Sequence, residues 1–416
     1  MSSNAGENWA RNYTYTARSL ARPASIAEVQ HLVAASRSVR ALGSRHSFTD
    51  LADTGGTLVS LEGLDVETEI DESSGTVTVP GGARYGDVAT ALQNAGWALH
   101  NLASLPHISV AGAVATGTHG SGDHNGTLAT AVAALEIVTA GGELLTLRRG
   151  DPDFDGAVVS LGALGIVTRV TLDIEPTFDV RQDLYDDLSW SALLDDFDAA
   201  TSSAYSVSLF TDWLGDTVGT TWLKSRADAA APPEHLLGAA RQPTGRHMLP
   251  GQPVTNVTQQ GGVVGPWNDR LAHFKLGFTP SNGDELQSEY LVPRHNAVAA
   301  LEAVRTLGPR VAPLLLITEV RTMRADSLWL SGAFETDAVG IHFTWKPLEA
   351  EVRALLPEIE ALLLPLGARP HWGKVFTADG GALEALYPRL GEFRALAARL
   401  DPERKFGNAF LERTVY

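Results

Sequence analysis

A carboxylate and a guanidinium share one face of a predicted strand in the second half of the chain. Residues 315–321 are mostly apolar, and the two-residue period of a strand places Glu319 and Arg321 on the same side. Such a pair can be a structural ion pair, or it can offer an acceptor and donors to the hydroxyl groups of a small molecule. This segment alone leaves both interpretations open.

Two other segments place polar side chains among apolar ones. His342 and Thr344 share one face of residues 341–345, opposite two aromatic side chains. Lys374 follows closely on a histidine and a tryptophan. A lone histidine in a strand is usually a hydrogen-bonded core residue. The number of polar side chains in apolar strands nevertheless favours a pocket for a hydroxylated small molecule, which requires such donors and acceptors.

Residues 88–122 contain no Asp, Glu, Lys or Arg, but they are rich in Ser, Thr, Asn, His and Gly. Within this segment, residues 109–122 carry four glycines and several other small side chains. Such a composition lets a ligand approach the main chain and reach its N–H donors. A tightly packed turn between two helices is the alternative, and composition does not separate the two.

Several motifs that carry chemistry are absent from the chain. Without a GxGxxG sequence, a Rossmann nucleotide site is unsupported, and the Gly-Lys pair at 373–374 lacks the following Ser or Thr of a P-loop. Neither GxSxG nor HExxH occurs. His119, Asp123 and His124 are close in sequence but lack the ligand spacing of a zinc site. We therefore expect no metal.

Composition narrows the class of protein further. The 416 residues are 44% hydrophobic, which is enough for two domains. A net charge of −17 disfavours nucleic acid and anionic membranes as partners. The absence of cysteine excludes disulfides, iron–sulfur clusters and any sulfur-linked cofactor. Neither a signal-peptide pattern nor a run of roughly 20 apolar residues occurs, so we expect a soluble cytoplasmic protein.

Helix and strand signals follow one another irregularly, as in α+β proteins. A capping box from Ser25 to Glu28 begins a predicted helix that ends near Ser36. The other predicted elements are a β-hairpin at 132–138 and 144–147, a further strand into which residues 161–170 lead, and a helix at 348–364. Pro176 interrupts the first set of strands and longer strands follow it, so we expect a domain boundary near this residue.

Three segments resemble the flavin-binding sequences of the vanillyl-alcohol-oxidase type FAD enzymes. They are Gly-Ser-Arg-His-Ser-Phe at 43–48, Ser-Leu-Pro-His-Ile-Ser-Val-Ala-Gly at 104–112 and Ala-Thr-Gly-Thr-His-Gly at 115–120. Within that family the chain is similar to the alditol oxidases, and the similarity extends over essentially the whole length. The further matching segments are 206–213, 285–291, 344–345, 369–376 and 405–410.

The resemblance implies a two-domain α+β flavoprotein. A FAD-binding domain of the vanillyl-alcohol-oxidase (PCMH-like) type would comprise residues 1–176, completed by residues 366–416. An α+β substrate-binding domain with an antiparallel sheet would comprise residues 177–365. The family's linked histidine falls on His46, which implies a covalent bond from its ring nitrogen to the 8α carbon of FAD. Because the chain has no cysteine, the variant linked through both His and Cys is excluded.

The resemblance also implies which residues contact the cofactor. The expected FAD-binding residues are Leu42, Gly43, Ser44, Arg45, His46, Ser47, Phe48, Ser104, Ser109, Gly112, Ala115, Thr116, Gly117, Thr118, His119, Gly120, Ile166, Val167, His371 and Asn408. Arg45 stands where the family often has glycine. If the loop requires a positive φ there, an arginine is strained; if not, its charge would assist the pyrophosphate or face solvent.

For the substrate, the resemblance implies a polyol held by a serine, a Glu–Arg pair, a threonine and a lysine. The expected polyol-binding residues are Ser104, Glu319, Arg321, Thr344 and Lys374, and the expected catalytic residues are Glu319, Arg321, His342 and Lys374. A terminal hydroxyl would become an aldehyde by hydride transfer to flavin N5, and molecular oxygen would become hydrogen peroxide. The two cations would stabilise the developing alkoxide, while Glu319 accepts substrate hydroxyls and helps proton removal and His342 tunes the proton path.

The nearest alternative is an aldonolactone oxidase or dehydrogenase, a related class that acts on sugar lactones. Its members have a similar histidine loop and a His-Trp-x-Lys sequence near the C-terminus. A non-catalytic binder of the same fold is a further alternative. Such a binder has no need of the covalent anchor that His46 would supply.

Overall fold

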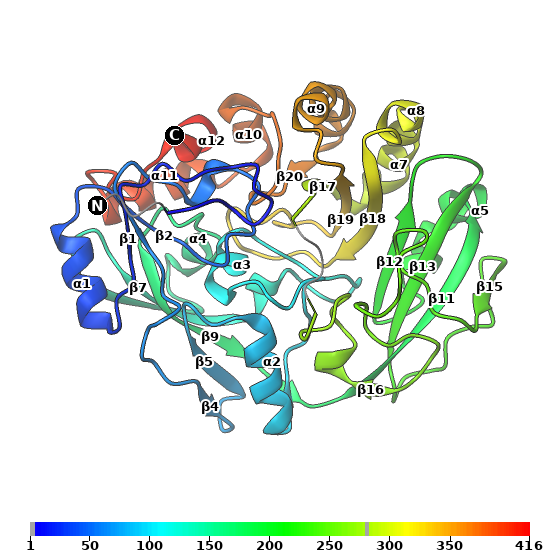
Figure 1. Cartoon of the computed structure of the whole chain (residues 1–416), viewed down its shortest axis with the longest axis horizontal. Helices are drawn as coiled ribbons and strands as arrows, with labels where there is room; N and C mark the ends of the chain where they lie inside the picture. The colour runs from blue at the N-terminus through cyan, green and yellow to red at the C-terminus, as the bar shows by residue number, and fades with distance from the viewer. Residues whose placement is uncertain (1–4, 279–282) are drawn as a thin grey trace.

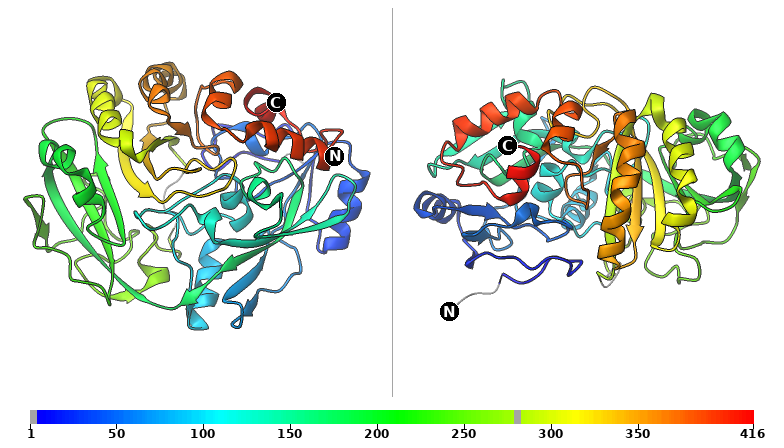
Figure 2. Two further views of the ribbon diagram at one scale, coloured as in Figure 1. Left: turned by 180° about the vertical axis from the view of Figure 1, so that it is seen from behind. Right: turned by 90° about the horizontal axis from the view of Figure 1, so that it is seen from above.

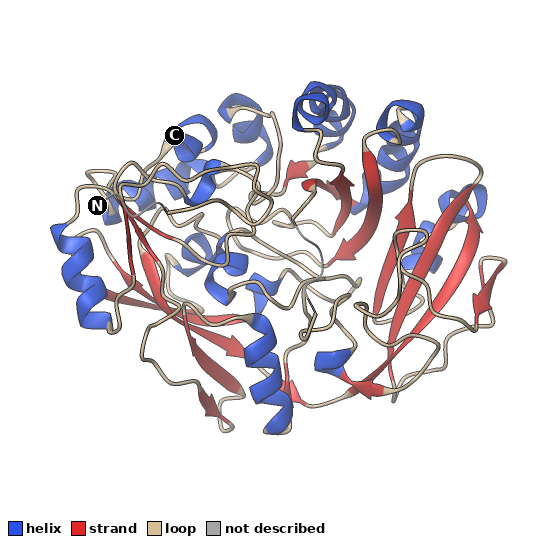
Figure 3. Ribbon diagram, viewed as in Figure 1, coloured by secondary structure: helices blue, strands red, loops and turns tan. Residues whose placement is uncertain are grey.

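The computed structural model describes residues 5–278 and 283–416. Several small sheets lie on one side of the molecule and one large sheet lies on the other, with loops and short helices between them (Figures 1 and 3). The N- and C-terminal segments lie on the side of the small sheets (Figures 1 and 2). None of the helices in these described ranges is long and apolar enough to cross a membrane.

The small sheets are built from the first 176 residues. A parallel sheet contains β1 (Ser19–Ala21), β3 (Thr57–Val59) and β2 (Val39–Ala41), and an antiparallel sheet contains β4 (Glu69–Asp71), β5 (Thr76–Pro80), β9 (Ile166–Asp173), β7 (Val132–Val138) and β8 (Leu144–Arg148). A short pair contains β6 (Trp97–Ala98) and β10 (Glu175–Pro176). The helices among them are α1 (Ile26–Ala35), α2 (Tyr85–Asn94), α3 (Val110–Ala115) and α4 (Phe154–Val158), with short 3₁₀ turns at Asp50–Ala52 and Leu128–Ala131.

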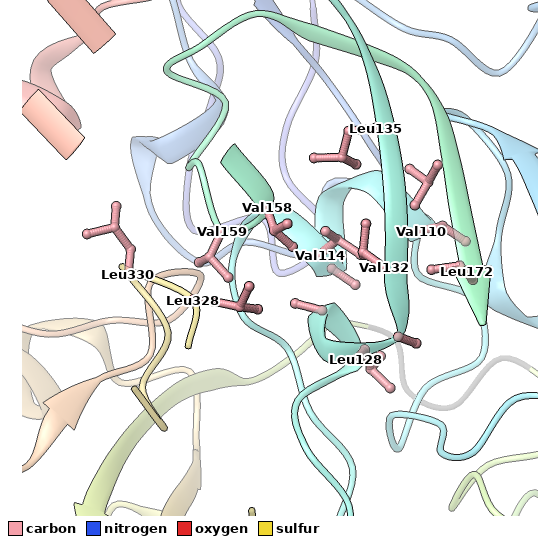
Figure 4. Close-up of a cluster of buried hydrophobic side chains, with 14 of the residues drawn as sticks. Val110, Val114, Leu128, Val132, Leu135, Val158, Val159, Leu172, Leu328 and Leu330 are labelled. Carbon is pink, nitrogen blue, oxygen red and sulfur yellow. The ribbon is translucent and has the colours of Figure 1, made fainter. Parts of the chain in front are cut away.

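A hydrophobic core holds α3 between the antiparallel sheet and α4. Val110 and Val114 of α3 pack beside Leu135 and Leu172 of β7 and β9, and all four side chains are at most 2% exposed (Figure 4). Burying a side chain of this size stabilises the fold by about 1.5–3 kcal/mol. This core therefore fixes the backbone on both sides of α3, where the uncharged small-residue segment runs.

The large sheet supplies most of the polar side chains discussed below. Its strands, in spatial order, are β14 (His235–Leu236), β15 (Ala239–Gln242), β11 (Asp179–Ser189), β13 (Thr217–Arg226), β12 (Ser206–Thr211), β18 (Leu315–Met323), β19 (Ala338–Trp345), β17 (Leu286–Pro293) and β20 (Arg369–Pro370), while β16 (Gly265–Pro266) pairs with β11. The helices that follow its strands are α5 (Trp190–Asp195), α6 (Phe197–Thr201), α7 (Ala297–Thr306), α8 (Gly308–Val311) and α9 (Glu349–Leu363), with 3₁₀ turns at Trp267–Asp269, Arg294–Asn296 and Leu364–Leu366.

The alternation of side chains gives this sheet one apolar and one polar face. Val320, Ile341 and Tyr290 point outward into a core shared with α7 and α9, which lie along that face (Figures 1 and 2). The residues between them in sequence therefore point inward, toward the small sheets. Because both faces are buried, the polar side chains on the inner face must find partners within the protein.

The C-terminal segment returns to the small sheets as α10 (Gly380–Leu386), α11 (Leu390–Leu400) and α12 (Ala409–Thr414) (Figure 1). Lys405 joins two elements there by donating to the carbonyls of Val33 and Ala140. Asn408 caps α12 and donates to three main-chain carbonyls of residues 50–53. A division at residues 176 and 366 stays our proposal; the strands of the large sheet lie between 179 and 370.

Most elements expected from the sequence are present. The Ser25 side chain accepts from the amide of Glu28 at the start of α1, and the predicted hairpin is β7 and β8. The strand at 315–321 is β18, and the helix at 348–364 is α9. The α+β class with an antiparallel sheet is confirmed.

Candidate active site

One long cavity runs from the small-residue loop at 43–48 to the inner face of the large sheet. The expected site residues that line it are Leu42, Gly43, Ser44, Arg45, His46, Ser47, Phe48, Ser104, Ser109, Gly112, Ala115, Thr116, Thr118, His119, Val167, Glu319, Arg321, His342, Thr344, His371 and Lys374. Residues far apart in sequence therefore meet around a single space.

Four expected cofactor residues lie outside this lining. Gly117 has a φ of +66°, and a Cβ on Gly120 would lie 2.5 Å from a side-chain oxygen of Asn101. Ile166 is fully buried in a neighbouring core. Asn408 makes the capping contacts already described. These four residues shape the backbone and its packing around the cavity.

The loop at 43–48 is pinned to the start of α3. The amide of Ser44 donates to Oγ of Ser109 over 3.3 Å, and the amide of Ser109 donates to Oγ of Ser44 over 3.0 Å. A Cβ on Gly43 would lie 2.4 Å from Oγ of Ser109, so only glycine permits this close approach. The two segments that the sequence singled out thus form one wall.

Arg45 has a positive φ of 64°, so the loop does require the left-handed conformation at this position. That conformation costs about 1–2 kcal/mol for a residue with a Cβ. The guanidinium of Arg45 donates to the carbonyls of Ala5 and Glu7 and lies over the ring of Tyr15. Its charge is therefore directed toward the N-terminal segment, and these contacts offset the strain.

His46 lies in this loop with an unused ring nitrogen. Its ring stacks on Trp9 at a centroid distance of 5.2 Å, and its Nδ1 is buried without a hydrogen-bond partner in the described part of the chain. Burial lowers the pKa of His46 to about 4, so the ring is neutral at pH 7. A buried neutral nitrogen facing no protein partner is suited to bonding a ligand.

Three titratable side chains form a row across the inner face of the large sheet. Glu319 of β18 pairs in register with His342 of β19, which pairs with Glu289 of β17. Because directly opposed residues in an antiparallel sheet lie about 4.5–5.5 Å apart, all three reach the same space. The predicted common faces of Glu319 with Arg321, and of His342 with Thr344, agree with this placement.

Glu289 is the centre of this group. Its carboxylate lies 2.5 Å from Nζ of Lys374 and 3.0 Å from both Arg321 and His119. Burial raises the pKa of Glu289, but Lys374, His119 and Arg321 outweigh that effect and hold the pKa well below its usual range. Gly340 makes room for this arrangement, since a Cβ there would lie 2.9 Å from a carboxylate oxygen of Glu289.

Glu319 is the second buried carboxylate on the face. Its Oε1 lies 2.7 Å from Nε2 of His273 and 3.6 Å from Nε of Arg321. Burial raises the pKa of Glu319, but Arg321 and His273 together lower it far below the usual value. Glu319 is therefore ionised at neutral pH and suited to accept hydrogen bonds from hydroxyl groups.

His342 lies between Lys374 and Thr344. Nζ of Lys374 donates to Nδ1 of His342 over 2.5 Å, and Nε2 of His342 lies 3.0 Å from the hydroxyl of Thr344. Burial and the charge of Lys374 lower the pKa of His342 to about 4, so its ring is neutral. Burial also lowers the pKa of Lys374, while Glu289 opposes that shift.

Sequence reasoning missed two of these side chains. Glu289 lies on β17 with a two-residue alternation that places it and Gln287 on the inner face, so the periodicity applied to β18 was available there too. His273 lies in an irregular segment, where no periodicity predicts the direction of a side chain.

The residues weighed as metal ligands do not converge. His119 faces Glu289, whereas Asp123 accepts two hydrogen bonds from Arg294. Across residues 5–278 and 283–416, no group of three His, Cys, Asp or Glu side chains is arranged to hold a metal ion.

Models of known protein families match segments in both halves of the chain. A FAD binding domain model matches residues 17–148, and a D-arabinono-1,4-lactone oxidase model matches residues 282–414. The chain is 49% identical to an alditol oxidase from a Streptomyces species over 412 residues, covering 98% of both. It is 31% identical over 439 residues to L-gulono-1,4-lactone dehydrogenase from Mycobacterium tuberculosis, again covering 98% of both.

A solved structure shares the fold. Cholesterol oxidase from B. sterolicum superimposes with a TM-score of 0.81 at 17% identity, covering 99% of this chain and 97% of that chain. At this identity the likeness concerns the fold alone. The residues present fit FAD, because the matched domain contains the 43–48 loop and the partnerless Nδ1 of His46.

Proposed function

Because this chain belongs to the alditol oxidase family of FAD-dependent oxidoreductases, we propose that it oxidises the terminal primary hydroxyl of alditols such as xylitol and sorbitol to the aldehyde. Molecular oxygen is the second substrate and hydrogen peroxide the second product. The observation that carries this proposal is the inner face of the large sheet, where ionised carboxylates and cations line one buried space beside the His46 loop.

FAD is bound by the loop at 43–48 and by the wall of small residues around α3. We assign the covalent attachment to His46, since its Nδ1 is buried, neutral and without a protein partner among the described residues. When bound, the flavin accepts a hydride from the substrate carbon and passes the electrons to oxygen. Trp9 orients the His46 ring by stacking, which reduces the freedom of the linking nitrogen.

The polyol is held by groups of complementary hydrogen-bonding character. Glu319 accepts from substrate hydroxyls, whereas Arg321 and Lys374 donate to them. Ser104 and Thr344 lie at the two ends of this set, at 3.4 Å from Arg321 and 3.0 Å from His342 respectively. A substrate lacking these hydroxyls would leave buried polar groups without partners, which penalises its binding.

Negative charge develops on the reacting oxygen as its proton leaves. Arg321 and Lys374 stabilise that charge, and Glu289 keeps both cations in place. His342 is neutral at pH 7, and its one acceptor nitrogen, Nδ1, accepts from Lys374. When Lys374 turns an N–H toward the developing alkoxide, Nδ1 becomes free to take the hydroxyl proton. Glu319 contributes as an ionised acceptor that fixes the substrate, because its depressed pKa opposes proton uptake.

Oxidation of sugar lactones is the second candidate function. It is favoured by the match of residues 282–414 to a D-arabinono-1,4-lactone oxidase model and by the gulonolactone dehydrogenase relative, at lower identity than the alditol oxidase. Peroxide release with xylitol or sorbitol, compared with gulonolactone at equal concentration, separates the two. Turnover of the lactone without turnover of the polyols would replace the first proposal with the second.

The covalent bond has its own test. Acid precipitation of the wild-type protein should leave the yellow chromophore with the pellet, and the same treatment of His46→Ala should release it. A wild-type pellet without colour would refute the linkage but not the reaction, because noncovalent flavin supports the same chemistry.

A further inference from the structure

A fully buried lysine lies on the inner face of the large sheet, two strands away from Glu319, and takes no part in the function proposed above. Lys224 of β13 is 1% exposed, and its Nζ donates to the carbonyls of Leu271 and Ala272 at 2.5 and 2.9 Å. Its third partner is Nδ1 of His273, at 3.1 Å. An ammonium group has three donors and no acceptor, so these three acceptors satisfy it completely.

The cost of burying this cation is not offset by a direct ion pair. Its hydrogen-bond partners in the described part of the chain are two carbonyl oxygens and a ring nitrogen, none of them a carboxylate. Burial accordingly lowers the pKa of Lys224 to about 7. An apolar side chain at this position would avoid the desolvation cost of the buried ammonium group. Packing alone therefore does not explain why a lysine is present here.

The contacts of His273 connect Lys224 to Glu319. Burial lowers the pKa of His273 to about 4, so its ring is neutral. Because the ionised carboxylate of Glu319 can only accept, the ring proton lies on Nε2, which donates to Oε1 of Glu319 over 2.7 Å, and Nδ1 accepts from Lys224. Strand β12 lies between β13, which carries Lys224, and β18, which carries Glu319. His273 therefore reaches across β12 to connect these two residues. The ring also packs edge-on against Phe210 and Trp222, and Oγ of Ser208 lies 3.5 Å from its Nε2.

The same segment holds a second substrate contact. The amides of His273 and Phe274 both donate to the carbonyl of Ser104, at 3.1 and 3.2 Å. Lys224 binds the two carbonyls just before His273, so it fixes the backbone from which these contacts extend. Lys224 is thereby connected to both Glu319 and Ser104 without lining the cavity itself.

We propose that Lys224 and His273 are a pair of positioning residues: Lys224 fixes the Nε2–H tautomer of His273, and that tautomer holds Glu319 as the ionised acceptor for substrate hydroxyls. This inference rests on the proposed function. In the opposite tautomer, Nε2 would present a lone pair to the carboxylate, and Glu319 would lose a donor and turn away. Since Glu319 contacts the substrate in both ground and transition states, its displacement weakens binding more than it slows chemistry.

The test uses the flavin-loaded full chain and the variant Lys224→Met. We expect the KM for xylitol to rise about tenfold with a smaller change in kcat, the size expected for a hydrogen bond to a charged group. Lys405→Met is the matched control, because Lys405 is also buried and donates to two carbonyls but lies at the FAD-domain side. Its KM should stay at the wild-type value.

The tautomer is measured without substrate. In protein labelled with [15N]histidine, the His273 signals are identified by their loss in His273→Gln. Wild-type protein should show a protonated Nε2 and an unprotonated Nδ1, and Lys224→Met should shift both signals. His273→Gln keeps an amide donor toward Glu319 and should retain a lower KM than His273→Leu.

Each outcome decides the proposal. A Lys224→Met enzyme with wild-type KM, or with unchanged His273 signals, overturns it. If Lys224→Met does not fold, equal KM values for His273→Gln and His273→Leu overturn it instead. If the wild-type enzyme oxidises no polyol, the proposed function is wrong. The 15N signals of His273 still test whether Lys224 sets its tautomer.

Discussion

Replacing Glu289 by glutamine should disable the enzyme although Glu289 is absent from the predicted set of catalytic residues. The change removes a negative charge that lies 2.5 Å from Lys374 and 3.0 Å from Arg321 and is completely buried. Leaving buried charges without their partner costs about 3–5 kcal/mol. Part of that cost appears as lower stability, and the rest appears in the pKa of Lys374.

The pKa of Lys374 is lowered by burial and raised by Glu289. Without Glu289 this pKa falls further, so a larger fraction of Lys374 is neutral at any given pH and cannot stabilise an alkoxide. Removing one such stabilising group slows the chemical step by about 10²–10³-fold. Because lower pH restores the ammonium, the defect should be smaller at pH 6 than at pH 8.

The assay is anaerobic reduction of the bound flavin by xylitol, followed at its visible absorbance in a stopped-flow instrument. Glu360→Gln is the matched control, since Glu360 is also buried but its carboxylate accepts from Tyr290 and Thr377 on the helix side of the sheet. Glu289→Asp keeps the charge and should retain more activity than Glu289→Gln. A Glu289→Gln enzyme that reduces flavin at the wild-type rate at both pH values would refute the reasoning.

Three further predictions use the same face of the sheet. Lys374→Met should slow flavin reduction about 10²–10³-fold in the same assay, and an unchanged rate removes Lys374 from the mechanism. Gly340→Ala should lower kcat/KM about tenfold while retaining flavin, because the added Cβ would lie 2.9 Å from Glu289 and 3.3 Å from His119. Wild-type kinetics in this variant would show that Glu289 and His119 can move aside without loss of activity. The pKa of His342 is lowered to about 4 in the folded protein from about 6.5 when unfolded, so the unfolded chain binds the proton first and stability falls as pH drops through this window. Between pH 6.5 and pH 4, the unfolding free energy of His342→Asn should fall by about 3 kcal/mol less than that of the wild type, as measured by urea denaturation. If the two proteins lose the same unfolding free energy over this pH range, the His342 ring is not held neutral.

The sequence by itself determined which side chains share a face and which loops lack charge. The two-residue period of a strand is local, so it placed Glu319 with Arg321 and His342 with Thr344 correctly. The capping box fixed the start of α1 for the same reason, because all of its contacts lie within four residues. The family resemblance, confirmed at 49% identity over 412 residues, was carried by short segments spread over the whole chain, several of which line the cavity.

Only the tertiary structure decided what stands opposite each of those faces. Register across β18, β19 and β17 brings Glu319, His342 and Glu289 together, and it depends on pairings between residues up to 53 positions apart, as in Glu289 with His342. The contact of His273 with Glu319 comes from an irregular segment whose course no local rule predicts. Likewise, the positive φ of Arg45 became understandable only from its contacts with Ala5, Glu7 and Tyr15, because strain at one residue is stabilised by partners elsewhere in the chain.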